Sequence, residues 1–224
     1  MFKNRIIKIN TPSKAQYPVR GVDVSRYQGD IDWPVLAGQD IRFAYIKATE
    51  GSTYIDQKFE YNFSQARQTD LRIGAYHFFS FDSGGDTQAD NYIKNVEAFS
   101  GMLPPIVDVE YYGKYGHGAG KRPDNDAVVA ELGVLLGWLE EHYGVKPVTY
   151  ATGTAYKDFI RGNFDDYDIW IRDVYFRPGS GIKNWCFWQF SDKGLLEGYS
   201  GGEKYIDLDV WSGSIEEFEN YGIK

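Results

Sequence analysis

Two acidic residues with one residue between them, Asp108 and Glu110, have the clearest chemical meaning in the sequence. The apolar run of residues 103–107 predicts a buried strand that ends at this pair. Side chains two residues apart on a strand point to the same face, with Cβ atoms about 6.5–7 Å apart. Carboxylates at that distance repel, so in a partly desolvated cleft one of them takes up a proton more readily. A protonated acid beside an ionised one can cleave a glycosidic bond, because one group protonates the leaving oxygen and the other stabilises the positive charge at the anomeric carbon.

The same pair has two simpler interpretations: solvated acids at the end of a strand, or ligands for a cation. The chain has three His and one Cys, and they form no cluster at metal-ligand spacing, so we expect neither a metal nor a cofactor. The apolar run favours the catalytic interpretation, because it forms a buried strand that aims both acids outward at its end.

Short apolar runs alternate with amphipathic ones along the chain. The predicted strands are residues 19–25, 42–47, 72–78, 106–110, 147–150, 168–172, 185–190 and 205–210. The predicted helices are residues 56–69, 86–99 and 124–143, where apolar residues recur with a period of 3.6. Asp56, Asp86 and Asp124 stand at the expected N-caps, and Gly144 stands at an expected C-cap.

This alternation predicts an α/β fold with a parallel sheet, and eight strand candidates suggest a closed barrel. Only the first five strands are followed by room for a helix, and the later gaps are short and rich in Gly and Pro. We therefore predict an irregular TIM-like barrel, with about five β/α units followed by three strands with few helices. A doubly wound open sheet is the alternative. Residues 20–224 form the single barrel domain, and residues 1–19 form an N-terminal tether or extension.

In such a barrel the site forms at the carboxyl ends of the strands. Acidic and aromatic side chains gather at the predicted strand ends, as do two neighbouring polar ones. They are Asp23, Tyr76, His77, Asp108, Glu110, Tyr150, Trp188, Gln189, Asp207 and Asp209. His77 is expected to be a packed wall residue, and Lys47 is expected to pair with Glu50 beneath the cleft.

Several blocks of sequence resemble the glycoside hydrolase family 25 lysozymes, in the same order along the chain. The blocks are GVDVSRYQGDIDW (21–33), FAYIKATEG (43–51), GAYHF (74–78), LPPIVDVE (103–110), WIR (170–172), FWQFS (187–191) and IDLDV (206–210). The resemblance implies a β/α barrel with few helices and cleavage of the β-1,4 bond between N-acetylmuramic acid and N-acetylglucosamine in peptidoglycan. One departure is Asp209, where the family often has Asn, and an extra acid there is expected to point away from the site.

The resemblance also implies a role for each matching position. Glu110 matches the general acid and Asp108 matches a carboxylate that assists attack by the substrate's own 2-acetamido group. Asp23 and Asp207 match two further acids of the cleft. The positions expected to line the sugar subsites are Tyr76, Tyr150, Trp170, Trp188 and Gln189. The carboxylate spacing lies between about 5–5.5 Å for covalent retaining enzymes and about 6.5–9.5 Å for inverting ones, so the spacing alone does not decide the mechanism. Substrate assistance tolerates that spacing, and we expect retention.

Composition narrows the possible partners. The net charge of -8 argues against nucleic acid, because phosphate binding needs a basic surface. No apolar run approaches the roughly 18 residues of a membrane span, and residues 1–9 lack the features of a signal peptide. The single cysteine, Cys186, lies in an apolar run and is expected to be a buried hydrophobe. We expect a monomer that acts on peptidoglycan glycan strands outside the cell or at the wall, with any export signal or anchor lying upstream.

Two other function classes stay open at this stage. One is another amino-sugar glycosidase such as a chitinase, although the Pro105-Ile106 lead into the acids differs from the longer run of acids usual there. The other is a non-catalytic glycan-binding barrel, which would be expected to lack at least one of the four acids.

Overall fold

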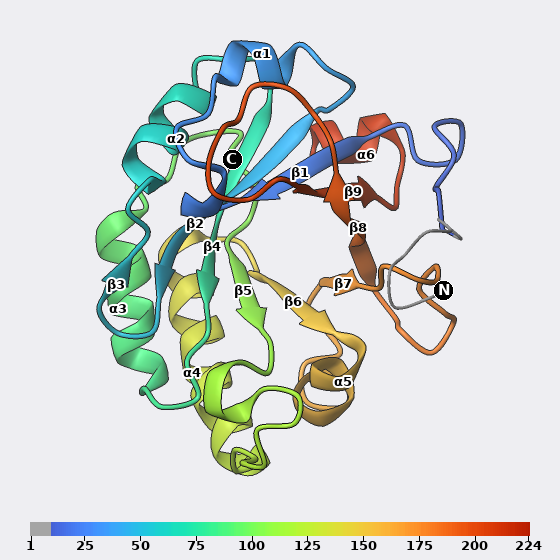
Figure 1. Cartoon of the computed structure of the whole chain (residues 1–224). Coiled ribbons are helices and arrows are strands. Elements are labelled where there is room, and N and C mark those ends of the chain that lie inside the picture. Colours follow the sequence, from blue (N-terminus) through green and yellow to red (C-terminus); the bar gives the residue numbers. More distant parts are fainter. Residues whose placement is uncertain (1–9) are drawn as a thin grey trace.

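The computed structural model describes residues 10–224, and its main sheet closes into a barrel (Figure 1). The barrel strands are β1 (Arg20–Val24), β2 (Phe43–Glu50), β4 (Arg72–Phe78), β5 (Ile106–Val109), β6 (Val148–Thr152), β7 (Ile169–Arg172), β8 (Trp185–Gly194) and β9 (Ile206–Trp211). They follow the order β1-β9-β8-β7-β6-β5-β4-β2, and pairing of β1 with β2 closes the ring. The predicted barrel is confirmed and the open sheet is excluded. A short strand, β3 (Tyr54–Ile55), which the sequence did not predict, pairs antiparallel with the end of β2.

The expectation of an entirely parallel sheet is wrong for the last strand. β9 runs antiparallel to both of its neighbours, β8 and β1. No helix separates β8 from β9, and a connection without a helical crossover lets consecutive strands pair antiparallel. As a result the first residues of β9, not its last, lie at the end of the barrel where β1 finishes, and Asp207 is the register partner of Asp23.

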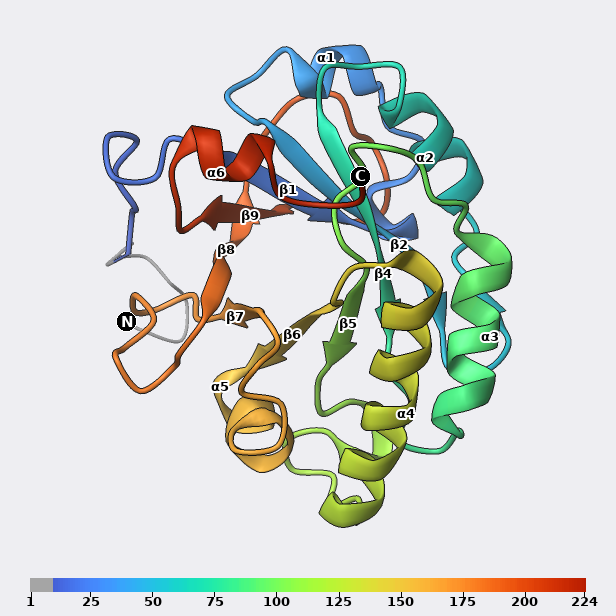
Figure 2. The same cartoon turned by 180° about the vertical axis from the view of Figure 1, so that it is seen from behind.

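The helices lie outside the barrel, mostly on one side of it. They are α1 (Trp33–Ala37), α2 (Phe59–Ala66), α3 (Gly85–Asn95), α4 (Asn125–Tyr143), the short α5 (Gly153–Ala155), which continues into a π-helical turn, η4 (Tyr156–Ile160), and α6 (Ile215–Glu219). Two 3-10 turns, η2 (Arg26–Gln28) and η3 (Gly113–Tyr115), complete the set. Figure 2 shows α3 and α4 side by side outside β4 and β5. From β7 to β9 the connections hold no helix, which confirms the prediction of about five β/α units followed by three strands.

Helix capping agrees with the sequence at one of the three predicted starts. The Asp124 side chain accepts hydrogen bonds from the first backbone N–H groups of α4, and Gly144 ends that helix with φ 66° in the left-handed region. Asp56 is not a cap, because α2 begins at Phe59 and the Asp56 carboxylate instead accepts from the N–H groups of Arg26 and Lys58. Asp86 lies inside the first turn of α3, whose N-cap is Gly84.

The barrel interior is a core of large aromatic side chains. Phe43, Tyr45, Trp170 and Phe187 are buried there, and the ring centroids of Tyr45 and Trp170 lie 5.1 Å apart. Glycine leaves the space for them: a Cβ atom on Gly74 would lie 2.2 Å from the Tyr45 ring. This aromatic layer fills the barrel interior beneath the polar end of the barrel.

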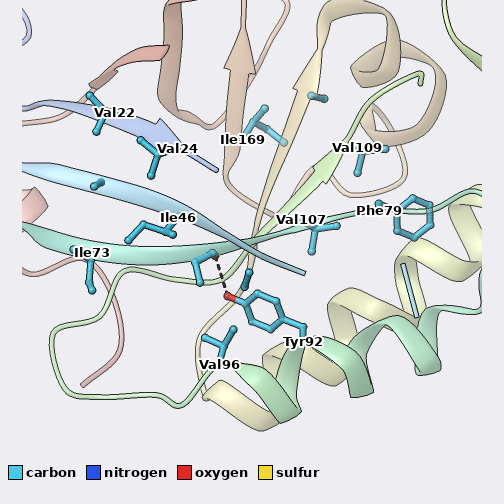
Figure 3. Close-up of a cluster of buried hydrophobic side chains, with 14 of the residues drawn as sticks. Val22, Val24, Ile46, Ile73, Phe79, Tyr92, Val96, Val107, Val109 and Ile169 are labelled. Atoms are coloured by element: carbon cyan, nitrogen blue, oxygen red, sulfur yellow. Dashed lines mark hydrogen bonds between the residues drawn. The ribbon is translucent and has the colours of Figure 1, made fainter. Parts of the chain in front are cut away.

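A second core fills the space between the barrel and its helices (Figure 3). The strands contribute Val22, Val24, Ile46, Ile73, Val107, Val109 and Ile169, which face Tyr92 and Val96 at α3 and Phe79 beyond β4. Tyr92 is fully buried, and its hydroxyl donates to the carbonyl of Ala75 at 2.9 Å. Burying each such side chain contributes about 1.5–3 kcal/mol, so this layer holds the helices on the barrel.

The first described residues contact the barrel. The side-chain amide of Asn10 donates to the carbonyls of Asp173 and Phe190, and Tyr17 is buried. Residues 1–9 of the predicted tether lie outside the described part of the chain. Cys186 is buried, as expected. In residues 10–224, no helix has the length and apolar character needed to cross a membrane.

Candidate active site

The predicted site residues converge on a cleft of about 380 Å³ at the carboxyl ends of the parallel strands. All but one of them line it: Asp23, Tyr76, Asp108, Glu110, Tyr150, Trp170, Gln189 and Asp207. Within residues 10–224, no group of three or more His, Cys, Asp or Glu side chains converges as metal ligands do. The four predicted acids therefore line the same cleft as the aromatic side chains.

Trp188, which was predicted to line a sugar subsite, does not line the cleft. Side chains alternate along β8, so Phe187 and Gln189 point into the barrel while Trp188 points outward. Trp188 is only 2% exposed, its Nε1–H donates to the carbonyl of Asp173 at 2.8 Å, and its ring packs against Tyr17. It belongs to the outer core and does not reach the cleft.

Asp108 and Glu110 lie at different depths in the cleft. Asp108, inside β5, is 8% exposed, and its Oδ1 atom is buried without a hydrogen-bond partner among the described residues. Glu110 follows the last residue of β5 and is more open to the cleft. Burial raises the pKa of both carboxyls, and the charge of Glu110 raises that of Asp108 further. The pair is therefore built to retain a proton where isolated acids would be ionised.

Asp23 and Asp207 face each other across β1 and β9. Burial raises the pKa of Asp23 to about 6, although the side-chain amide of Gln189 donates to its Oδ2 at 2.7 Å and opposes the rise. Burial and the charge of Asp23 raise the pKa of Asp207 to about 8. The Tyr150 hydroxyl donates to Oε1 of Gln189 at 3.0 Å, which fixes the amide so that its NH₂ group faces Asp23.

The sequence suggested that Asp209 points away from the site, and this expectation is wrong. It is fully buried beneath the cleft, and its Oδ1 accepts from the Trp170 Nε1–H at 3.0 Å. Its Oδ2 has no donor among the described residues. Burial raises the pKa of Asp209 well above its usual range, as do the charges of Asp23 and Asp207. A hydrogen bond between Asp209 and Asp23 lowers the pKa of Asp23 and raises that of Asp209, so the proton belongs to Asp209.

Arg172 is the functional residue that sequence reasoning missed. It ends β7, lines the cleft, and pairs with Asp192 at 2.8 Å. Its positive charge lowers the pKa of Glu110, Asp23 and Asp207 against the larger effect of burial. Its position as the last residue of a predicted strand was the signal that could have found it.

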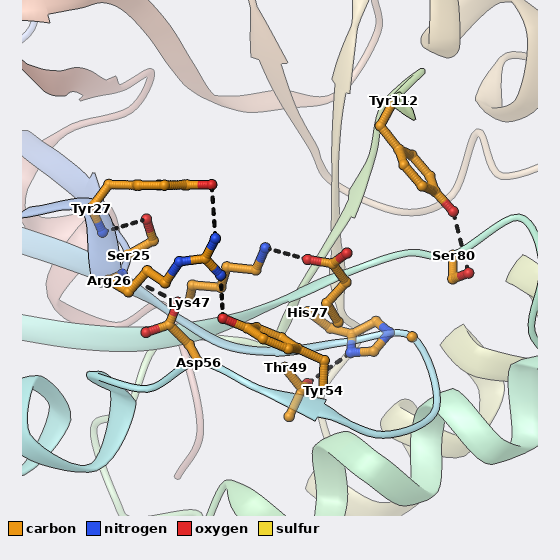
Figure 4. Close-up of polar contacts among 12 residues, drawn as sticks. Ser25, Arg26, Tyr27, Lys47, Thr49, Tyr54, Asp56, His77, Ser80 and Tyr112 are labelled. Atoms are coloured by element: carbon orange, nitrogen blue, oxygen red, sulfur yellow. Dashed lines mark hydrogen bonds and ion pairs between the residues drawn. The ribbon is translucent and has the colours of Figure 1, made fainter. Parts of the chain in front are cut away.

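Lys47 provides a second positive charge from β2. Its Nζ pairs with Glu50 at 2.8 Å, as predicted, and Figure 4 marks this ion pair at the end of the Lys47 side chain. The charge of Lys47 lowers the pKa of Asp108. His77 is fully buried beside it, with Nδ1 2.7 Å from the Thr49 hydroxyl and Nε2 3.1 Å from Oε1 of Gln88. Burial lowers the pKa of His77 to about 4, so it is a neutral wall residue and not a base.

The closed β/α barrel collects carboxyls with raised pKa values and aromatic walls in one cleft, an arrangement typical of glycoside hydrolases. The comparisons with known proteins agree with this class. The sequence profile described as Glycosyl hydrolases family 25 matches residues 22–199. The chain therefore belongs to glycosyl hydrolase family 25, and the resemblance seen in the sequence is confirmed.

Individual relatives support the assignment. A family 25 glycosyl hydrolase from Bacillus anthracis has a similar structure, with a TM-score of 0.89, 46% identity, and coverage of 97% of this chain and 99% of that one. The uncharacterized protein YegX from Escherichia coli is 34% identical over 94% of this chain and 76% of its own length. Lysozyme M1 from Streptomyces globisporus is 28% identical over 88% of this chain and 68% of its own length.

Proposed function

We propose that this protein is a lysozyme-type peptidoglycan hydrolase, an N-acetylmuramidase that cleaves the β-1,4 bond between N-acetylmuramic acid and N-acetylglucosamine. Membership of family 25 and similarity to lysozyme M1 support peptidoglycan as the substrate. The observation that carries the catalytic proposal is the Asp108 and Glu110 pair, held in the cleft with both pKa values raised.

Glu110 acts as the general acid. It lies beyond the end of β5 and has the longer, more open side chain, so it reaches a glycosidic oxygen more easily than Asp108 does. Its proton passes to the leaving oxygen as the bond from that oxygen to the anomeric carbon breaks. In the second step the ionised Glu110 takes a proton from the attacking water.

Asp108 assists the substrate's own acetamido group. Its buried Oδ1 lacks a donor among residues 10–224, and the N–H of a 2-acetamido group supplies one. The carbonyl oxygen of that group then bonds to the anomeric carbon as the leaving group departs, which forms an oxazolinium-like intermediate. Water opens it from the opposite face, so the anomeric configuration is retained.

The same contact places the shared proton where it is needed. Burial raises the pKa of Asp108 well above its usual range, and the charge of Glu110 raises it further. An N–H donated to Asp108 favours its ionised form, and the proton of the pair then moves toward Glu110. Substrate binding thus increases the protonated fraction of Glu110, the general acid.

The remaining residues shape the cleft. Asp23, with a pKa of about 6, supplies negative charge that stabilises the oxocarbenium-like transition state. Asp207, with a pKa of about 8, keeps its proton near neutral pH and positions the sugar by hydrogen bonding. Tyr76 and Tyr150 form the sugar-facing walls. Trp170 and Gln189 are almost fully buried and act from below the cleft. Trp170 donates a hydrogen bond to Asp209, and Gln189 donates one to Asp23.

The rate at which a peptidoglycan suspension clears tests the role of Glu110 as the general acid. Glu110→Gln should reduce kcat by about 10²- to 10⁴-fold, because the amide has no acidic proton to give. Glu60→Gln, the same change on the exposed surface of α2, should leave activity unchanged. Clearing at the wild-type rate by Glu110→Gln would contradict the role of Glu110.

Analysis of the products tests which glycosidic bond is cleaved and whether the anomeric configuration is retained. New reducing ends should be N-acetylmuramic acid, and ends of N-acetylglucosamine would make the muramidase assignment wrong. An NMR time course should show the β-anomer first, while the α-anomer first would rule out retention.

The protein acts as a monomer outside the cell or at the wall, where its proposed substrate lies. Light scattering on the purified protein should give a mass near 25.6 kDa.

A further inference from the structure

A second cavity, of about 810 Å³, adjoins the catalytic cleft. Arg172 borders both spaces. The remaining walls come from the segment 111–122, which follows Glu110 directly, and from Thr152 and Thr154 beyond β6. The second cavity therefore continues the cleft from the general acid outward.

The charge of this cavity is opposite to that of the cleft. Arg172, Lys121 and Arg122 bring positive charge to its walls, and no acidic residue of the described chain lines it. The whole protein has a net charge of -8, so the positive walls are a local feature. A concave surface lined by charge of one sign concentrates ligands of the other sign.

Aromatic rings, and not carboxylates, hold the two exposed cations. Lys121 Nζ lies 5.3 Å from the ring centroid of Tyr115, and Arg122 Cζ lies 4.9 Å from that of Tyr111. No ion pair within residues 10–224 includes Lys121 or Arg122. Their charge is therefore positioned but not neutralised.

The nearby acids are occupied elsewhere. Asp82 pairs with Lys114 at 2.8 Å and accepts from the Tyr115 hydroxyl at 2.8 Å. Asp158 accepts from the Tyr111 hydroxyl at 2.7 Å. These contacts hold the two tyrosines in place under the cations and leave the cations facing the cavity.

We propose that this cavity is an anion subsite that binds the carboxylate groups carried on the muramic acid of the glycan. The inference rests on the proposed function, because the 3-O-lactyl group of muramic acid brings a carboxylate close to the bond that is cleaved. That carboxylate is either the lactyl group's own or belongs to the stem peptide attached to it. The basic walls beside Glu110 match either source.

Binding of soluble glycan fragments tests the subsite without turnover. Three preparations are compared: fragments with stem peptides, fragments freed of peptide with the lactyl carboxylate exposed, and the latter with the carboxylate converted to an amide. Titration calorimetry uses Glu110→Gln as the parent, with and without Lys121→Gln and Arg122→Gln. The matched control carries Lys14→Gln and Lys94→Gln, which removes the same charge from two residues with 71% exposed side chains outside the cavity.

The double change in the cavity should weaken the binding of carboxylate-bearing fragments roughly five- to twentyfold and leave the amide unaffected. Weakening with peptide-bearing fragments alone identifies the stem peptide as the source, and weakening with the peptide-free fragments alone identifies the lactyl carboxylate. Weakening with both shows that the subsite takes either carboxylate. Unchanged binding, equal weakening for all three preparations, or the same weakening in the control would overturn the proposal. Carboxylate-dependent binding by a wild-type protein that cleaves no glycan would refute the proposed function alone.

Discussion

Replacing Asp209 with asparagine should stabilise the folded protein at neutral pH, by an amount that grows with pH. The side chains have nearly the same shape, and the asparagine oxygen can still accept from the Trp170 Nε1–H. Its NH₂ group can donate to Asp23, as the protonated carboxyl of Asp209 does. The substitution thus removes the titration of Asp209 and keeps its hydrogen bonds.

The size of the effect follows from proton linkage. Because burial raises the pKa of Asp209 well above its usual range, the folded state holds a proton that the unfolded chain releases near pH 4. Stability from this group is therefore complete below the unfolded pKa and declines as pH rises toward the folded pKa. The decline is at most about 1.4 kcal/mol per pH unit, so the advantage of Asp209→Asn should increase by up to about 2.7 kcal/mol between pH 5 and pH 7.

Urea unfolding at pH 5, 6 and 7 measures this difference. Asp166→Asn is the control, because Asp166 is exposed, pairs with Lys146 at 2.6 Å and has a lowered pKa. Its titration lies below this pH range, so its small effect should be the same at all three values. If the stability difference between Asp209→Asn and wild type does not change with pH, or if the variant is less stable at pH 7, Asp209 is not a buried neutral acid.

Three further changes probe the cleft and the frame around it. Gln189→Leu removes the donor to Asp23, so the pKa of Asp23 should rise above about 6 and the acidic limb of the pH profile of kcat/KM should move to higher pH. Tyr92→Phe removes a buried hydrogen bond to the carbonyl of Ala75 and should cost about 1–2 kcal/mol in urea unfolding, with kcat unchanged. Asp124→Ala removes the N-cap of α4 and should cost about 1 kcal/mol by the same assay, whereas Asp124→Ser should recover most of the loss.

Local pattern was sufficient for much of the fold. The eight barrel strands lie where apolar runs stand in the sequence, because each strand buries side chains against the barrel or the helices. The start of α4 was correct because Asp124 caps it with its own side chain. The predictions of Asp56 and Asp86 as N-caps were wrong, because an acid near a helix start can bind other N–H groups. A sequence does not show which of these groups lie nearby.

The acid pair Asp108 and Glu110, the further acids Asp23 and Asp207, and the barrel that collects them could all be found in the sequence, since strand ends and residue types are local properties. Only the tertiary structure decided the direction of β9, which pairs Asp207 with Asp23, and the outward side of β8 that removes Trp188 from the cleft. It also buried Asp209 beneath Asp23 and placed Arg172 between the acidic cleft and the basic cavity. The physical reason is that burial and opposing charges set each pKa here, and both depend on neighbours far apart in the chain.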